Sequence, residues 1–132
     1  MKKKFIIDVA NYDKNRLGSQ VERILKLCKI DPKGRVLINV KGMTQKDKLK
    51  LVLVARFLAN KLDEKIDSKV SNSELSYILN APIYQARARA SEIVREGFAI
   101  SDTKGTFSVV PYRIDDFLEY AEVFVQREET KS

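Results

Sequence analysis

The chain contains no histidine and no tryptophan, and Cys28 is the one cysteine among its 132 residues. Without histidine, Ser-His-Asp and Cys-His catalysis are excluded, and so are zinc sites built from histidine and cysteine. A lone cysteine allows no intrachain disulfide, which is typical of proteins from a reducing compartment. The composition therefore excludes many common hydrolases and zinc proteins.

Long hydrophobic runs are also missing. The longest, Leu51–Ala55, is far shorter than the ~20 residues that span a bilayer. Near the N-terminus only Phe5–Ile7 separates three lysines from Asp8, which is too short for the apolar region of a secretion signal. We therefore expect a cytoplasmic protein without a membrane segment. The five glycines form neither a P-loop nor a dinucleotide-binding pattern, so no nucleotide cofactor is expected.

The chain has 44% hydrophobic and 33% charged residues, which suits one folded domain with a short appendage. Its net charge of +7 is unevenly distributed. The charge is +6 over residues 1–40, +4 over 41–70, zero over 71–110 and −3 over 111–132. A basic excess of this size favours a polyanionic partner, chiefly nucleic acid, although a solvated basic surface is the alternative.

Residues 1–42 predict a basic extension of β-α-β type. Phe5–Ala10 has the β-branched and aromatic composition of a strand, and Arg35–Val40 resembles it. Between them, the spacing of Ser19 and Glu22 predicts a capped helix that continues to about Cys28. Cys28 then lies on the apolar stripe, where we interpret it as a small buried hydrophobe rather than a redox group. An extension of this size cannot form a core of its own.

Residues 43–132 predict a larger domain that begins with a long helix. Thr44 and Asp47 have capping-box spacing, and Leu49–Leu62 is apolar on most faces except at Arg56. We expect this helix at the centre of the molecule. Asp63–Lys69 is expected to be a charged loop.

Shorter elements follow that loop. We expect a helix over 71–80 that starts at Asn72 or Ser73, has Glu74 in its first turn and ends at Asn80 in a left-handed conformation. A helix from Pro82 to about Glu96 ends at Gly97. Next come a hairpin with strands 98–100 and 107–110, and a closing helix over about 115–126.

These residues resemble the winged helix-turn-helix family. The matching positions are Glu74-Leu75, Leu79, Asn80, Ala81, the buried Ala86, Ala90 and Ile93, and Gly97-Phe98 at the entry to the wing. Lys46–Leu62 is similar to the first helix of winged-helix regulators common in archaea, and the resemblance covers roughly Thr44 to Leu118. It implies an α+β fold in which the helix after Pro82 is the recognition helix.

The face of that helix opposite Ala86, Ala90 and Ile93 is centred near Ala88, at ~100° per residue. In a helix-turn-helix this helix enters the major groove, where arginine pairs with guanine and glutamine with adenine. The candidate DNA-binding residues are Tyr84, Gln85, Arg87, Ala88, Arg89, Arg95 and, at the tip of the hairpin, Lys104. Alternatively, this face is simply solvated, with its arginines paired to Glu92 and Glu96.

We therefore expect a sequence-specific double-stranded DNA-binding protein, a transcriptional regulator rather than an enzyme, with no metal or cofactor. Asp8 at a strand end resembles the first acidic residue of PIN-like nucleases, but no parallel sheet supplies the other carboxylates. Tyr120 and Val123 remain as apolar surface on the last helix, which favours a homodimer. The alternative function is a winged-helix module that holds a protein partner within a transcription or replication assembly.

Overall fold

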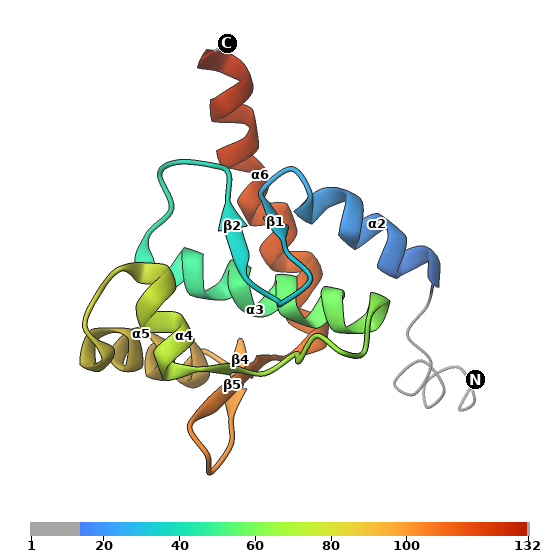
Figure 1. The fold of residues 1–132 in the computed structure, drawn as a ribbon. Coiled ribbons are helices and arrows are strands. Elements are labelled where there is room, and N and C mark those ends of the chain that lie inside the picture. The colour runs from blue at the N-terminus through green and yellow to red at the C-terminus, as the bar shows by residue number, and fades with distance from the viewer. Residues whose placement is uncertain (1–13, 132) are drawn as a thin grey trace.

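The computed structural model describes residues 14–131, and the side chains of residues 14–126. The predicted strand Phe5–Ala10, with Asp8, and the three lysines before it lie outside the described residues. The elements in chain order are α2 (Lys14–Ile24), β1 (Cys28–Ile30), β2 (Val36–Ile38), α3 (Gln45–Leu62), β3 (Val70–Ser71), α4 (Asn72–Leu79), α5 (Ile83–Arg95), β4 (Ala99–Ser101), β5 (Thr106–Val109), the 3-10 helix η1 (Pro111–Arg113) and α6 (Ile114–Lys131) (Figure 1). The fold is α+β, as expected.

Helix α3 lies at the centre of the molecule, as predicted. It begins with a capping box, in which the Thr44 hydroxyl accepts from the Asp47 N–H at 3.1 Å and the Asp47 carboxylate accepts from the Thr44 N–H at 3.1 Å. From Leu49 to Ala59 most of its apolar side chains are buried by the surrounding elements, with Leu49, Leu51 and Leu53 fully inaccessible. This all-round burial is why the sequence of α3 shows no polar face.

Arg56 is the buried cation within α3, with an exposed fraction of 6%. Its guanidinium donates to the carbonyl oxygens of Asp67 at 2.6 Å, Lys69 at 3.1 Å and Gly34 at 3.4 Å. It also forms an ion pair with Glu74 at 2.5 Å. Arg56 therefore connects α3 to the β1–β2 turn, to the segment before β3 and to α4.

The extension before α3 differs from the prediction. Helix α2 begins at Lys14, so Ser19 lies inside it and the predicted capping box is wrong. The helix also ends before Cys28, which belongs to β1, and Leu25 is 56% exposed, so the apparent apolar stripe continued past the true helix end. β1 and β2 form an antiparallel hairpin rather than strands on either side of a helix.

A tight turn explains this hairpin. The Asp31 carboxylate accepts the backbone N–H groups of Lys33 and Arg35, each at 2.9 Å, and Gly34 adopts a positive φ of 90°. An aspartate before proline, with glycine two residues after that proline, is a common turn sequence. Proline and glycine are also common just after the end of a helix, so a helix end and this turn share the same sequence signals.

Helices α4 and α5 follow the prediction closely. The cap of α4 is Ser71, whose hydroxyl accepts from the Glu74 N–H at 3.2 Å, and not Asn72 or Ser73 as expected. Asn80 ends the helix in the left-handed region with φ of 52°, and Gly97 follows α5 with φ of 81°. Both terminators are therefore confirmed.

The second sheet has the strand order β3-β5-β4. The predicted hairpin is confirmed as β4 and β5, while β3 falls where the sequence analysis expected the start of a helix. Val70 pairs with Phe107 in this sheet and is fully buried. The two residues of β3 are too few to show a strand pattern in the sequence. Among the described residues, no helix is long and apolar enough to cross a membrane.

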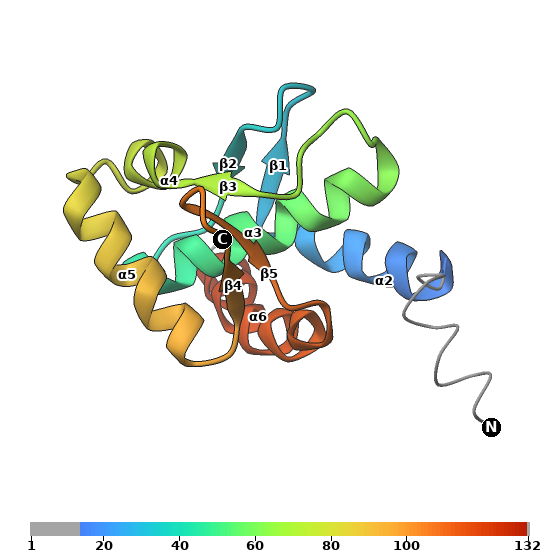
Figure 2. The ribbon, with the colours of Figure 1, turned by 90° about the horizontal axis from the view of Figure 1, so that it is seen from below.

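One buried cluster joins the N-terminal extension to the rest of the chain, and it includes Ile24, Leu27, Cys28 and Val36 together with residues of α3 and α6. Seen from below, α5 and α4 lie to one side of the β4–β5 hairpin, and α2 lies on the opposite side of the molecule (Figure 2). Helix α6 is longer than expected. The Tyr120 hydroxyl on it donates to the Asp47 carboxylate at 3.1 Å, so this side chain has a partner within its own chain.

Candidate functional site

The candidate site is centred on the solvent-facing side of α5. Ala86, Ala90 and Ile93 are completely buried against the body of the protein, as the helical spacing predicted. The exposed residues at the opposite positions of the same helix are Tyr84, Arg87, Ala88, Ser91 and Arg95. Because they are three or four residues apart along the helix, they share one face.

Gln85 and Arg89, two of the predicted base-contacting residues, lie at the margin of that face. The Gln85 side-chain amide donates to Gln45 at the start of α3 at 2.9 Å. The Arg89 guanidinium forms an ion pair with Glu92 at 2.8 Å, which is one of the pairs expected for a solvated face. Both side chains are half-buried, and each has a partner within the protein, although the Nε of Arg89 is buried without a hydrogen bond.

Lysines of α3 neutralise the acidic end of α5. Lys46 lies between Glu92, at 3.7 Å, and Glu96, which it contacts directly, and Lys50 lies 3.3 Å from Glu96. The hydrogen bond from Lys46 holds the pKa of the Glu96 carboxyl below its usual value, and the same bond raises the pKa of Lys46. Lys50 also lies over the Phe98 ring, 5.3 Å from its centroid.

The other two carboxylates of residues 71–110 are paired in the same way. Glu74 is bound by Arg56, and Asp102 lies 3.5 Å from Lys69. All four carboxylates of this segment are thus paired with cations from residues 46–69. Within the part of the chain that the structure describes, the cations of segment 71–110 that have no ion pair are Arg87, Arg95 and Lys104.

The tip of the β4–β5 hairpin holds Lys104 in an ordered turn. The Asp102 carboxylate accepts the backbone N–H groups of Lys104 at 2.9 Å and Thr106 at 3.0 Å, and the Thr106 hydroxyl at 2.7 Å. These bonds, chiefly the one from the Thr106 hydroxyl, lower the pKa of Asp102. Gly105 has a positive φ of 79°, and its carbonyl accepts from the Asn72 amide at 3.4 Å. The tip is therefore connected to the start of α4.

Sequence reasoning missed the cations that neutralise this site, namely Lys46, Lys50, Arg56 and Lys69. The sequence does contain a signal for them: residues 41–70 carry a net charge of +4 and directly precede residues 71–110, whose net charge is zero. A chain that folds back on itself brings two such blocks together. The positions of the partners within each block depend on the packing of α3 against α4 and α5.

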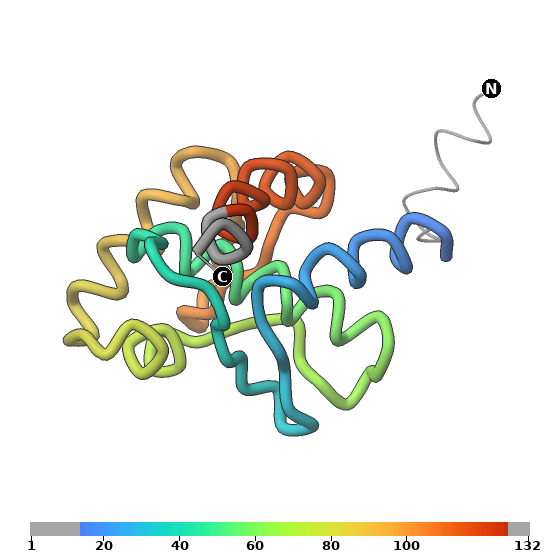
Figure 3. The backbone as a smooth tube through the Cα atoms, turned by 90° about the horizontal axis from the view of Figure 1, so that it is seen from above, coloured from blue at the N-terminus to red at the C-terminus, as the bar shows by residue number. Residues whose placement is uncertain are grey.

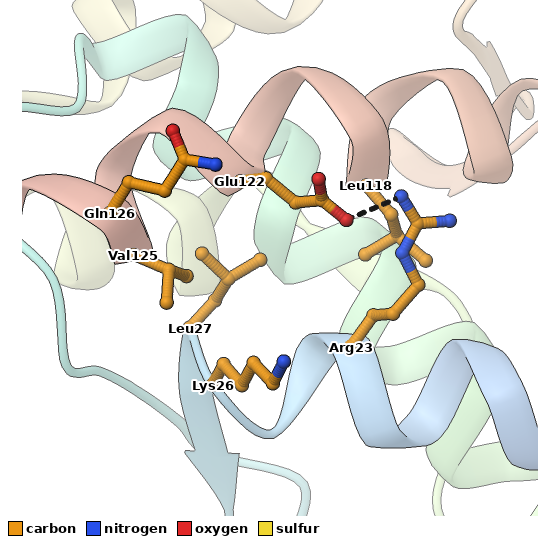
Figure 4. A pocket seen from close by; sticks show the side chains of 7 residues that line it. All are labelled: Arg23, Lys26, Leu27, Leu118, Glu122, Val125 and Gln126. Atoms are coloured by element: carbon orange, nitrogen blue, oxygen red, sulfur yellow. Dashed lines mark hydrogen bonds and ion pairs between the residues drawn. The ribbon is translucent and has the colours of Figure 1, made fainter. Parts of the chain in front are cut away.

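A separate small cavity of about 220 Å³ lies between α2 and α6 (Figure 4). Arg23 and Glu122 form an ion pair of 2.9 Å across it, with Leu27 and Val125 nearby. The charges of Arg23 and Glu122 neutralise each other, and Lys26 is the third charged side chain of the lining. No group of three or more metal-ligating side chains gathers anywhere among residues 14–131.

Comparison of the chain with protein-family models, with curated proteins and with solved structures finds no match. The functional argument therefore depends on the arrangement of the chain's own residues.

Proposed function

We propose that the protein binds double-stranded DNA sequence-specifically, as a transcriptional regulator of the winged helix-turn-helix class that acts as a homodimer. In this proposal α5 is the recognition helix and the β4–β5 hairpin is the wing. The order α3, α4, α5, β4, β5 supports this assignment, and so does the tight connection between α4 and α5 through the left-handed Asn80.

The observation that carries the proposal is the pairing of every carboxylate in residues 71–110. Those residues are neutral overall, yet their acidic charges are bound by cations of α3 and of the segment after it. Arg87 and Arg95 on α5, and Lys104 on the wing, are left exposed without an ion pair among the described residues. A face of this kind attracts a phosphate backbone.

The candidate residues divide into three roles. In this proposal Arg87 contacts a guanine in the major groove. Ala88 has a small side chain, which lets the helix approach the floor of the groove or touch a thymine methyl group. Arg95 and Lys104 bind phosphates, which orients the protein without distinguishing sequences. Gln85 helps to hold α5 against α3 through its bond to Gln45, and Arg89 is paired within α5 to Glu92. Tyr84, which is 75% exposed, lies in the first turn beside the base-contacting residues.

A salt titration of DNA binding tests the proposal. For a protein that contacts several phosphates, the logarithm of the binding constant falls linearly with the logarithm of the salt concentration, with a slope of about 0.9 per phosphate. We expect a steep slope on random DNA, and tighter binding on sites selected from a random pool. Little affinity for any duplex at moderate ionic strength would reject the proposal.

A second candidate function is a winged-helix module for a protein partner. Three large apolar side chains around the α4–α5 turn favour it, because Tyr77 is 80%, Tyr84 75% and Ile83 46% exposed. Aromatic side chains of this kind are enriched at protein interfaces. The same titration separates the two candidates, since a protein-interaction module would show little DNA affinity and no steep salt dependence.

A further inference from the structure

The β1–β2 hairpin leaves one edge of β2 unpaired. Backbone bonds close the hairpin at both ends of the strands, from Asp31 N to Arg35 O and from Asn39 N to Leu27 O. Hydrogen-bonded pairs alternate in an antiparallel ladder, so the bonded pair between these two is Lys29 with Leu37.

The N–H and C=O groups of Val36 and Ile38 therefore point away from β1. No backbone or side-chain group of the described residues bonds to them. An edge of this kind is a template for one more strand.

A groove runs beside this edge, between β2 and α4, with a volume of about 550 Å³. Its apolar lining comes from Val36 and Leu37 on one side and from Tyr77 and Ile78 on the other. Leu37 is 65% exposed and Tyr77 is 80% exposed. A free strand edge beside an apolar groove is the combination by which proteins bind extended segments: the backbone supplies hydrogen bonds and the groove receives alternate side chains.

The chain itself contains a segment with matching chemistry. Phe5–Ala10 has the composition of a strand and places Phe5, Ile7 and Val9 on one side. A single strand has no stability in water without a partner strand and an apolar surface to cover. The edge of β2 offers the partner strand, and the groove offers the apolar surface.

The direction of α2 indicates that a second copy supplies the segment. Lys14 lies at the end of α2 that is remote from β2 and α4 in the views from the side, from below and from above (Figures 1, 2 and 3). Helix α2 has 11 residues and is ~16 Å long. The three residues between Ala10 and Lys14 span at most ~14 Å. The N-terminal end of α2 therefore lies on the side of the molecule away from the chain's own groove.

The charge of the groove is compatible with this occupant. Three lysines directly precede Phe5, and the lining of the groove contains two carboxylates, of Asp31 and Glu74, and one cation, Arg35. Each carboxylate already has one basic partner, Arg35 or Arg56, and Glu74 remains 45% exposed.

We propose that Phe5–Ala10 of one chain adds as a third strand to the free edge of β2 in a second copy, with its apolar side chains in the groove against α4. The exchange is reciprocal and closes with two-fold symmetry. This inference names the interface of the proposed homodimer, and it does not depend on DNA binding.

Disulfide trapping between two different full-length chains tests the proposal. Both chains carry Cys28→Ala. One also carries Ile6→Cys, Ile7→Cys or Asp8→Cys in turn, so that every register is sampled, and the other carries Leu37→Cys. On oxidation of the mixture we expect a mixed disulfide for at least one of the three positions.

The control partner carries Leu62→Cys, which is 66% exposed on a different surface. Because docking holds the thiols at a high effective concentration, the Leu37→Cys partner should react at least ~10-fold faster.

Equal rates with the two partners would overturn the proposal. So would a disulfide that forms only within single chains when both cysteines are placed in one molecule, because the segment would then serve its own groove.

Light scattering of the full-length protein, without the cysteine substitutions, gives an independent measurement of its oligomeric state. We expect a dimer at micromolar concentration, and we expect Ile7→Asp to raise the dimer dissociation constant at least ~10-fold. Ile38→Pro should act similarly, because it removes an outward N–H that β1 does not use, and circular dichroism checks that this variant folds. A monomeric wild type, or a dimer unaffected by both substitutions, would show that the segment does not dock on β2.

Discussion

Two arginines of α5, two residues apart, show that the surroundings of a side chain decide whether it is available to a partner molecule. Arg87 is exposed and has no ion pair among the described residues, whereas Arg89 is half-buried and bound to Glu92 at 2.8 Å. Their identical chemistry made them equal candidates in the sequence. The helix rotation of ~200° between them places them on different sides of α5.

Replacing Arg87 tests its assignment as the base-contacting residue. We expect Arg87→Ala to cost ~1–3 kcal/mol of binding free energy on the selected site and to relax the preference at one or two base pairs. Arg95→Ala is the matched control, since loss of a phosphate contact weakens binding to all sequences alike. Sites selected from a random pool with each variant provide the measurement, and an unchanged motif with Arg87→Ala would contradict the assignment.

Cys28 gives a pH-dependent prediction. Burial raises the pKa of its thiol from 9.0 to about 12. Above pH 9 the unfolded chain ionises this thiol while the folded chain keeps the proton, so stability is present below pH 9 and is lost as the pH rises toward 12. The free energy of unfolding of the wild type, measured relative to Cys28→Ala, should fall by about 1.4 kcal/mol between pH 8 and pH 10.

Urea unfolding of both proteins at each pH measures this difference. Groups other than Cys28 titrate alike in the two proteins, so their effects cancel. A constant difference across this range would mean that the thiol ionises as easily in the folded state as in the unfolded one.

At the scale of elements, the ends of the helices follow local chemistry. The capping boxes of α3 and α4 and the left-handed Asn80 each involve residues within a few positions of one another. Such contacts depend little on the rest of the fold, so sequence patterns located the cap of α3 and the end of α4. The cap of α4 was expected at Asn72 or Ser73 and lies at Ser71 instead.

The left-handed Asn80 is tested by two substitutions. Asn80→Ala should lower the free energy of unfolding by ~1–2 kcal/mol, because a β-carbon without a polar side chain disfavours φ of 52°. Asn80→Gly should leave it nearly unchanged, because glycine adopts this conformation freely. Thermal unfolding of the two variants compares them, and an equal loss in both would show that the asparagine side chain, rather than the backbone angle, is what matters.

Arg56 links α3 to the β1–β2 turn, to the segment before β3 and to α4. Arg56→Ala would leave the Gly34, Asp67 and Lys69 carbonyls and the Glu74 carboxylate without this donor. We expect a loss of ~3 kcal/mol in the free energy of unfolding. Arg23→Ala, which breaks the more exposed pair with Glu122, should cost less than ~1 kcal/mol. Similar losses in the two variants by urea unfolding would contradict a special role for Arg56.

At the scale of the whole molecule, the charge of one segment is balanced by another. Residues 41–70 carry +4 and residues 71–110 carry no net charge. The fold pairs cations of the first segment with every carboxylate of the second, and this leaves the exposed cations of α5 and of the β4–β5 hairpin without an ion pair among the described residues.

Removing the cations behind α5 tests this balance. We expect the double variant Lys46→Ala, Lys50→Ala to bind DNA several-fold more weakly at low salt, since Glu92 and Glu96 would lose these partners. The difference from wild type should shrink as salt screens the charges. Lys48→Ala is the control, because Lys48 lies on the same helix without an ion pair among the described residues. Because the control removes one charge and the double variant removes two, a control effect half as large on the logarithm of the binding constant would show that total charge alone decides affinity.

The sequence by itself determined most of the elements from Thr44 onward, although not β3. The central helix, its cap, the left-handed Asn80, the buried side of α5 and the β4–β5 hairpin were all predicted, because each depends on neighbours along the chain. Tertiary structure decided the rest. β1 and β3 are three and two residues long, too short for a pattern, and each exists only because a distant or following strand pairs with it. Arg89 and Glu92 lie three residues apart, and their pairing was one of the alternatives that the sequence offered. The bond of Gln85 to Gln45, and the pairing of Lys46, Lys50, Arg56 and Lys69 with the carboxylates of residues 71–110, join residues far apart in the chain, and no local spacing encodes which of them meet.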